Sequence, residues 1–207
     1  MSKYHKFVFD SENRRFVGNF EEMYQQESEV GFDSWHQEDN RQLNRKIALS
    51  ILESYNFGNI LDLGCGKGAF THFLKKSNNK VVGIDVSDTA LSIARGRFPD
   101  IDFDNFDINQ TSELENYFYN QYGDNAEKID LVFSAELFSY LSNYKEVLAC
   151  LSKKCRYIMI TLYLPENPIG FVKSKYELEN SISDHFEILE LVELKKSRFS
   201  IVFAKSK

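Results

Sequence analysis

Short apolar runs alternate with stretches of helical periodicity along most of the chain, from about residue 56 onwards. Seven of the runs have the length and the β-branched content that are typical of strands. The predicted strands are Asn59–Leu63, Lys80–Ile84, Ile101–Phe103, Ile129–Ser134, Arg156–Leu162, Phe186–Glu193 and Arg198–Ala204. Four of the stretches between them have the apolar spacing of helices. The predicted helices are Ala69–Lys76, Asp88–Arg97, Thr111–Tyr119 and Asn143–Leu151.

The order of these elements predicts an α/β fold built on a mostly parallel, seven-stranded sheet with helices on both faces. The last two strands are separated by little more than "KKS", which is too short for a crossover connection. They must therefore form an antiparallel hairpin at one edge of the sheet. A dinucleotide-binding fold would keep alternating strand and helix, so this C-terminal hairpin distinguishes the two.

The first 55 residues have a different pattern, which is polar, charged and aromatic. Within them Leu43, Ile47 and Ile51 recur every four residues, which predicts a helix that packs these side chains on the sheet. We therefore divide the chain into residues 1–55, a helical segment that covers the substrate, and residues 56–207, a cofactor-binding domain. The first 20 residues match no motif and are either a flap that orders on substrate binding or a dimer arm.

Composition narrows the class of protein. A net charge of −6 argues against affinity that rests on a phosphate backbone, so no nucleic acid partner is expected. Three cysteines without a framework spacing fit a reducing compartment. No apolar run approaches the ~20 residues of a membrane span, and the N-terminus lacks the apolar core of a signal peptide. We expect a cytoplasmic protein, monomeric or homodimeric, without membrane contact.

The stretch "NILDLGCGKGAFT" places glycines where a ligand would bind. Gly64, Gly66 and Gly68 follow the first predicted strand, and their backbone can approach a ligand closely. The spacing to Ala69 also matches the looser dinucleotide fingerprint. However, the carboxylate of Asp62 beside a pyrophosphate would repel it. It would suit a ligand with an ammonium group and a positive sulfonium.

Two further carboxylates stand at the ends of the next strands. Asp85 ends the second strand and can accept hydrogen bonds from both hydroxyls of a ribose. Asp107 follows the third strand and can accept one from an adenine amino group. Together with Asp62 they outline an adenosine that carries a cationic methionine tail.

The motifs "LDLGCGKG", "VVGIDVS", "FDNFDI" and "IDLVFSAELFSYL" carry a resemblance over residues 54–205. The chain resembles the class I S-adenosylmethionine-dependent methyltransferases that act on small molecules and sugars. The resemblance implies a Rossmann-like fold, S-adenosylmethionine as cofactor and S-adenosylhomocysteine as product. No metal is expected, because the sequence has no convincing His/Asp cluster. The residues that the resemblance implies for the cofactor are Asp62, Gly64, Cys65, Gly66, Gly68, Asp85, Val86, Asp107, Ile108 and Ser134, the last through its carbonyl.

Methyl transfer requires alignment of the acceptor, and a hydroxyl acceptor usually also needs a general base. The candidate catalytic residues are His36, Glu136 and Tyr140, whereas His185 is expected to be a turn residue.

The candidate substrate-binding residues are Tyr24, Trp35, Arg41, Arg45 and Tyr163. Arg41 and Arg45 share a helix face and form either a clamp for an anionic substrate or a solvated surface. Trp35 either covers the bound molecules or packs in the core.

These observations predict methyl transfer to oxygen or nitrogen of a small soluble acceptor, such as a sugar, a nucleotide-sugar or another anionic metabolite of polysaccharide or secondary metabolism. Two alternatives remain open. One is a non-catalytic, cofactor-binding subunit that regulates a partner protein, and the other is an RNA methyltransferase. The sequence "SAEL" after the fourth strand departs from the Asn/Asp-Pro-Pro-aromatic signature of enzymes that methylate amino groups of nucleic acids.

Overall fold

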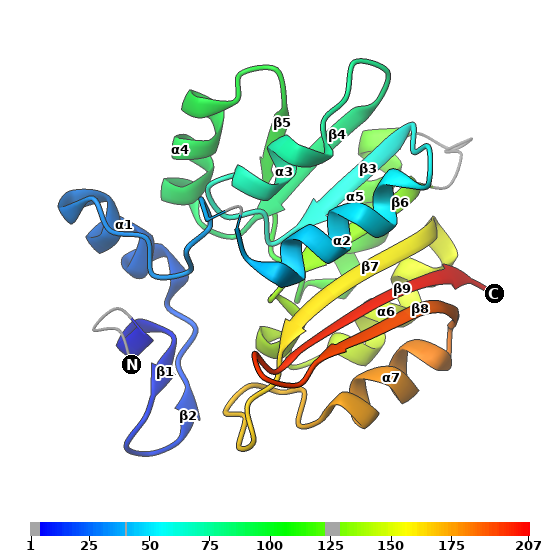
Figure 1. Ribbon diagram of the computed structural model, residues 1–207. Coiled ribbons are helices and arrows are strands. Elements are labelled where there is room, and N and C mark those ends of the chain that lie inside the picture. The colour runs from blue at the N-terminus through cyan, green and yellow to red at the C-terminus, as the bar shows by residue number, and fades with distance from the viewer. Residues whose placement is uncertain (1–4, 40, 123–128) are drawn as a thin grey trace.

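The computed structural model describes residues 5–39, 41–122 and 129–207. Its main sheet has the strand order β5-β4-β3-β6-β7-β9-β8 (Figure 1). The strands are β3 (Asn59–Leu63), β4 (Lys80–Asp85), β5 (Asp102–Asn105), β6 (Ile129–Ala135), β7 (Cys155–Tyr163), β8 (Phe186–Leu194) and β9 (Phe199–Ser206). Strands β3 to β7 pair in parallel, and β9 is antiparallel to both of its neighbours, β7 and β8. The predicted sheet and its C-terminal hairpin are confirmed.

Helices cover both faces of the sheet (Figure 1). They are α2 (Leu43–Glu53) and α3 (Ala69–Leu74) on one face, α5 (Thr111–Tyr122), α6 (Tyr144–Lys154) and α7 (Lys175–Ser183) on the other, and α4 (Asp88–Arg97) beside β5. Side chains alternate between the two cores along β9. Val202 and Ala204 join the core under α6 and α7, whereas Ile201 and Phe203 join the core under α2 and α3. The sheet therefore separates two apolar layers, as its two-residue period requires.

Helix α4 begins and ends where the sequence predicted. The hydroxyl of Ser87 accepts a hydrogen bond from the backbone N–H of Ala90 at 3.1 Å, which caps the helix. Pro99 follows the last turn and cannot continue it. The start of α4 therefore has a fixed position next to the end of β4.

The apolar stripe of α2 differs from the prediction. Leu43 is 58% exposed, and the buried positions are Asn44, Ala48 and Leu52. Ile47 and Ile51 are partly buried and pack against the same core, as predicted. Because Leu43 is the first residue of the helix, it lies at its open end, and the face that packs on the sheet is rotated by one residue. The prediction that Leu43 packs on the sheet is wrong.

Several elements escaped the sequence pattern. They are η1 (His5–Phe7), the hairpin of β1 (Phe9–Asp10) and β2 (Arg15–Phe16), α1 (Phe20–Val30), η2 (Phe138–Tyr140) and α7. Strands of two residues are too short to show a period, and the buried face of α1 includes a charged residue, Glu27. In Figure 1 the hairpin and α1 lie beyond the ends of the parallel strands. The division of the chain near residue 55 stays a prediction.

None of the helices in the described ranges is long and apolar enough to cross a membrane.

Candidate functional site

A cavity lies at the carboxyl ends of β3, β4 and β6, where open α/β sheets bind their ligands. Its walls come from two parts of the chain. The strand ends and the segments after them contribute Asp62, Gly64, Cys65, Ile84, Asp85, Val86, Phe106, Asp107, Ile108, Ala135, Glu136 and Tyr140, among others. The N-terminal segment and α2 contribute Phe20, Tyr24, Trp35, Gln37 and Arg45. The cavity therefore exists only where these two parts meet.

The glycine loop borders the cavity, which Gly64 and Cys65 line. Gly64, Gly66 and Gly68 all have positive φ, at 70°, 53° and 75°, which is a conformation that side-chain-bearing residues rarely adopt. A Cβ on Gly66 would lie 2.6 Å from Gln37 Oε1 and 2.8 Å from Tyr24 Oη. The N-terminal segment thus rests directly on the loop.

Asp62 is the most deeply buried carboxyl in the cavity wall. It is 2% exposed, and Thr71 Oγ1 donates to its Oδ2 at 2.6 Å. Burial, together with the nearby charge of Asp85, raises the pKa of Asp62 to about 7, although the bond from Thr71 opposes this shift. A cation in the cavity would stabilise its charged form.

Asp85 lies at the end of β4 and is oriented by two backbone donors. Its Oδ1 accepts from the N–H of Ser87 at 3.0 Å, and its Oδ2 accepts from the N–H of Gly66 at 2.9 Å. Burial raises the pKa of Asp85 despite these bonds. The carboxylate therefore joins the glycine loop to the second strand.

Asp107, Ile108 and Val86 also line the cavity, as predicted from the sequence. Asp107 Oδ1 accepts from both the backbone and the side-chain nitrogen of Asn109 at 3.0 Å. Ile108 is buried, and Val86 is 46% exposed. These residues form one end of the cavity, next to Phe106.

Two predicted cofactor residues are buried. Cys65 lies inside the glycine loop and lines the cavity, and burial raises the pKa of its thiol. Ser134 is fully buried in β6 and does not line the cavity, whereas the next residue, Ala135, does.

Glu136 lies just past the end of β6 with a positive φ of 65°. Its Oε2 accepts from the backbone N–H of Tyr163 at 2.7 Å, and its Oε1 lies 3.4 Å from Thr161 Oγ1. Burial raises the pKa of Glu136 to about 7, although these hydrogen bonds and the charge of Arg45 oppose the shift. The carboxyl of Glu136 is thus fixed by hydrogen bonds and changes charge near neutral pH.

Tyr140 faces the cavity and contacts aromatic rings of the N-terminal segment. Its ring centroid lies 5.3 Å from that of Phe20, 5.9 Å from that of Trp35 and 5.8 Å from that of Phe16. Burial and the charge of Glu136 raise the pKa of Tyr140, so its hydroxyl stays protonated. Aromatic packing therefore joins the two walls.

The two predicted arginines are separated in the structure. Arg45 lines the cavity and donates to the backbone oxygens of Gln37 and Asp39. Arg41 precedes α2, its side chain is 88% exposed, and it pairs with Asp39 at 3.0 Å. The prediction that Arg41 and Arg45 share a helix face is wrong, because the helix begins only at Leu43.

The structure does not bring His36 or Tyr163 to the cavity. His36 is exposed in a turn with a φ of 49°. Tyr163 is 45% exposed with its ring beside Phe199, and only its backbone reaches Glu136. His185 lies in the turn before β8, as expected. Within the described residues, no group of three or more His, Cys, Asp or Glu side chains could hold a metal ion.

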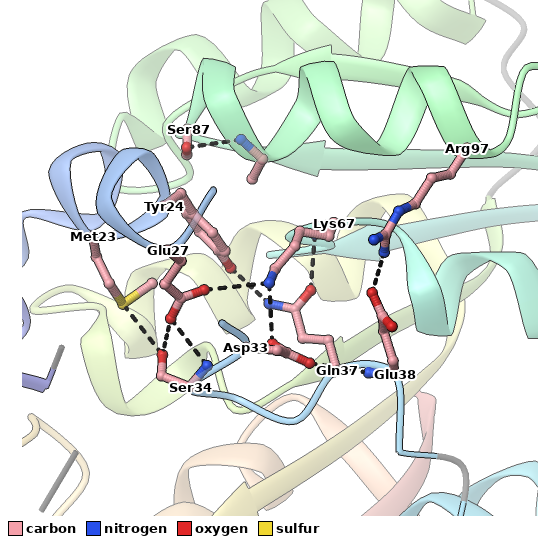
Figure 2. Close-up of polar contacts among 11 residues, drawn as sticks. Met23, Tyr24, Glu27, Asp33, Ser34, Gln37, Glu38, Lys67, Ser87 and Arg97 are labelled. Carbon is pink, nitrogen blue, oxygen red and sulfur yellow. Dashed lines mark hydrogen bonds and ion pairs between the residues drawn. The ribbon is translucent and has the colours of Figure 1, made fainter. Parts of the chain in front are cut away.

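Gln37 is a site residue that the sequence pattern did not indicate. Its Oε1 accepts from the backbone N–H of Lys67 at 2.8 Å, and its Nε2 donates to Tyr24 Oη at 2.8 Å. Figure 2 shows this amide between the N-terminal segment and the glycine loop. Tyr24, predicted as a substrate residue, thus contacts the loop that carries the glycines. No periodicity marks Gln37, and only its nearness to Trp35 in the sequence could have suggested it.

A second contact joins α1 to the start of α4. Glu21 accepts from the hydroxyls of Ser87 and Thr89, both at 2.6 Å, and from the backbone N–H of Thr89 at 3.2 Å. Burial raises the pKa of Glu21, but the hydrogen bonds from Ser87 and Thr89 outweigh it and lower that pKa to about 2. The N-terminal segment is therefore attached next to the end of β4.

Comparison with known proteins shows what this chain is similar to. Residues 61–156 match a family model described as a methyltransferase domain. Two ubiquinone biosynthesis O-methyltransferases are similar to the chain. The one from Actinobacillus pleuropneumoniae is 30% identical over 82 residues, and the one from Pasteurella multocida is 26% identical over 95. The matches span 40% and 44% of this chain but only 34% and 39% of the relatives.

Solved structures agree with the fold. A SAM-dependent methyltransferase from Anabaena variabilis covers 91% of this chain and 93% of its own, with a TM-score of 0.71 and 14% identity. The magnesium protoporphyrin IX methyltransferase of Synechocystis, solved with bound SAM, covers 99% of this chain and 95% of its own, with a TM-score of 0.61 and 17% identity. The Rossmann-like class I fold is confirmed by these structures, and residues 61–156 match the methyltransferase domain model within it.

Proposed function

We propose that this chain, whose residues 61–156 match a methyltransferase domain model, transfers a methyl group from S-adenosylmethionine to oxygen or nitrogen of a small acceptor. One observation supports the cofactor above the others. Asp62 is a buried carboxyl with a pKa raised to about 7, next to backbone without Cβ atoms, so a cation in the cavity lowers the free energy of its charged form. The ammonium and sulfonium groups of the cofactor provide such a charge.

The other residues at the strand ends fit the remaining parts of the cofactor. Asp85 would accept hydrogen bonds from the ribose hydroxyls, because its carboxylate is oriented at the cavity wall. Asp107 and Ile108, which line the cavity next to Phe106 in the chain, would hold the adenine. Bound there, the cofactor supplies an activated methyl carbon.

The chain itself would align the acceptor and remove its proton. Glu136 is the candidate general base, because its carboxyl is held by Tyr163 and Thr161 and titrates near neutral pH. Trp35 and Tyr140 would form the walls around the acceptor. Arg45 would bind an anionic group, since it is the cationic side chain among the described residues that line the cavity.

The polar groups near Glu136 bear on the class of acceptor. Both polar atoms of the Gln37 amide bind protein partners. The remaining lone pairs of Glu136, the N–H groups of Arg45 other than those at Nη1, and the hydroxyl of Tyr140 would serve a ligand. Each buried hydroxyl of a sugar needs its own partner. A nucleotide-sugar would use Arg45 for its phosphates. A hydroxylated aromatic acid is the second candidate, supported by the aromatic wall of Phe20, Trp35 and Tyr140 and by the similarity to ubiquinone biosynthesis O-methyltransferases.

Calorimetry with S-adenosylhomocysteine, followed by turnover assays with the two acceptor sets, tests the proposal. Binding plus turnover of either set supports it, and the set that reacts identifies the acceptor class. Binding without turnover of any acceptor would favour the regulatory subunit. Turnover of RNA, with binding that falls steeply as salt rises, would favour an RNA methyltransferase. The absence of cofactor binding would remove the proposal.

A further inference from the structure

A lysine of the glycine loop contacts the chain on both sides of Trp35. Lys67 is 6% exposed, and its Nζ lies 3.2 Å from Asp33 Oδ1. Its backbone N–H donates to Gln37 Oε1 at 2.8 Å. Figure 2 shows both contacts converging on Lys67. The short segment from Asp33 to Gln37, with Trp35 at its centre, is therefore attached at each end to one residue.

Lys67 also reaches this segment through α1. Its Nζ lies 3.3 Å from Oε2 of Glu27, which is 1% exposed. The other carboxylate oxygen of Glu27 accepts from the backbone N–H of Ser34 at 3.0 Å and from the Ser34 hydroxyl. The residue directly before Trp35 is thus bound to Lys67 through one intermediate carboxylate.

Because these contacts are buried, breaking them costs free energy. A charge that is removed from water needs an opposite charge or hydrogen bonds within the protein. Outside this arrangement, the buried side chains of Glu27 and Lys67 would each lose an opposite charge. The ion pair therefore favours one placement of the Trp35 segment over others.

A second ion pair, made by the residue that directly follows this segment, is not buried. Glu38 pairs with Arg97 of α4, but the two side chains are 57% and 45% exposed. Water can replace either partner, and exposed pairs contribute ~0–1 kcal/mol. The buried pair and the exposed pair can therefore be compared for their effect on the position of Trp35.

We propose that Lys67 is a positioning residue of the acceptor site. It holds Trp35 at the cavity wall, so the acceptor wall depends on the same loop that binds the cofactor. Lys67 does not itself line the cavity, and it acts through Asp33, Glu27 and Gln37. This inference rests on the proposed function, because it takes the cavity to hold both cofactor and acceptor.

The variant Lys67→Met tests the inference, and Trp35 reports on it because it is the only tryptophan of the chain. We expect quenching of Trp35 emission by acrylamide to rise about threefold or more in the free protein. We also expect KM for the acceptor to rise about tenfold, while Kd for S-adenosylhomocysteine changes less than about threefold. A role in folding alone would lower the melting temperature without this split between KM and Kd.

Three further variants serve as controls. Lys67→Arg keeps the charge and should restore most of the protection of Trp35. Arg97→Met removes the exposed pair with Glu38, next to the segment, and should leave quenching unchanged. If Lys67→Met does not fold, the double variant Lys67→Met with Glu27→Gln removes both charges of the buried pair. It should fold and still expose Trp35, because Asp33 loses its contact with the Lys67 ammonium.

Unchanged quenching in the folded Lys67→Met or double variant would overturn the inference. So would an equal effect of Arg97→Met, or a loss of S-adenosylhomocysteine affinity in parallel with the rise in KM. The quenching measurement needs no ligand. A wild-type protein that binds no S-adenosylhomocysteine would therefore remove the proposed function, while the placement of Trp35 by Lys67 would still be decided.

Discussion

The two walls of the cavity are built by different physical means. At the strand ends, the parallel register places Asp62 beside Gly83, and Asp85 beside Asn105, so backbone pairing fixes both carboxylates. On the N-terminal side, Gln37 and Trp35 lie in a segment without regular structure that is held by side-chain contacts. The first wall moves only if the sheet moves. The second depends on a few polar contacts and aromatic rings, so the variants below are expected to affect the two walls separately.

The largest expected effect is on turnover and comes from Glu136. This residue lies at the strand-end wall and faces Arg45 of the N-terminal wall. Glu136→Gln should lower turnover by about 10²–10⁴ if this residue is the base, with S-adenosylhomocysteine affinity unchanged. Because the pKa of Glu136 is raised to about 7, wild-type kcat/KM should rise with pH up to about 7 and then level off. A pH–rate profile for both proteins checks this. A flat wild-type profile from pH 6 to 9 would remove Glu136 from the chemistry.

Asp85 tests the strand-end wall alone. Asp85→Ala should weaken cofactor binding roughly 100-fold, because two charge-assisted hydrogen bonds to the ribose contribute about 1.5–3 kcal/mol each before local relaxation. Trp35 quenching should change little, because the N-terminal segment keeps its contacts to Lys67. Calorimetry with S-adenosylhomocysteine measures the loss, and circular dichroism checks the fold. An affinity equal to that of the wild type would contradict the ribose role.

The pH dependence of cofactor affinity tests the role of Asp62 in the strand-end wall. A bound cation should lower its pKa from about 7, so binding releases a proton, and affinity should rise up to about tenfold per pH unit between pH 5 and 7. In the free protein, the stability that Asp62 contributes depends on pH with the opposite sign. The stability contributed by Asp62 is full below its unfolded pKa of ~3.9 and is lost as pH rises through the folded value. Calorimetry in buffers of different ionisation enthalpy measures the released proton. Asp62→Asn is the control, and it should bind with no such pH dependence.

The smallest effects are expected on the N-terminal wall. Arg45→Ala should raise KM for an anionic acceptor by about tenfold, since it removes a charge at the cavity surface. Arg41→Ala should stay within about twofold of the wild type, because its ion pair with Asp39 is exposed. Steady-state kinetics on both variants measure the difference. Equal effects would mean that the cavity geometry does not separate the two arginines.

The sequence predicted the strand-end wall in detail. Asp62, Asp85 and Asp107 stand directly after or within apolar runs, and each of them lines the cavity. The N-terminal wall could be predicted only in part. Trp35 and Tyr24 line the cavity, but His36 does not, because a turn with positive φ directs the chain so that its side chain is exposed. Neighbours in an irregular segment share no period, so sequence spacing cannot tell which of them faces inward.

The sequence by itself determined the sheet, its C-terminal hairpin and the position of the glycine loop. These depend on local apolar periodicity and on residues that permit positive φ, and both are written in consecutive positions. Only the tertiary structure decided that Lys67 binds Asp33 and Glu27, and that Arg45 rather than Arg41 reaches the cavity. Such contacts join residues about 30 to 40 positions apart, and they form because buried charges need partners, wherever in the chain those partners lie.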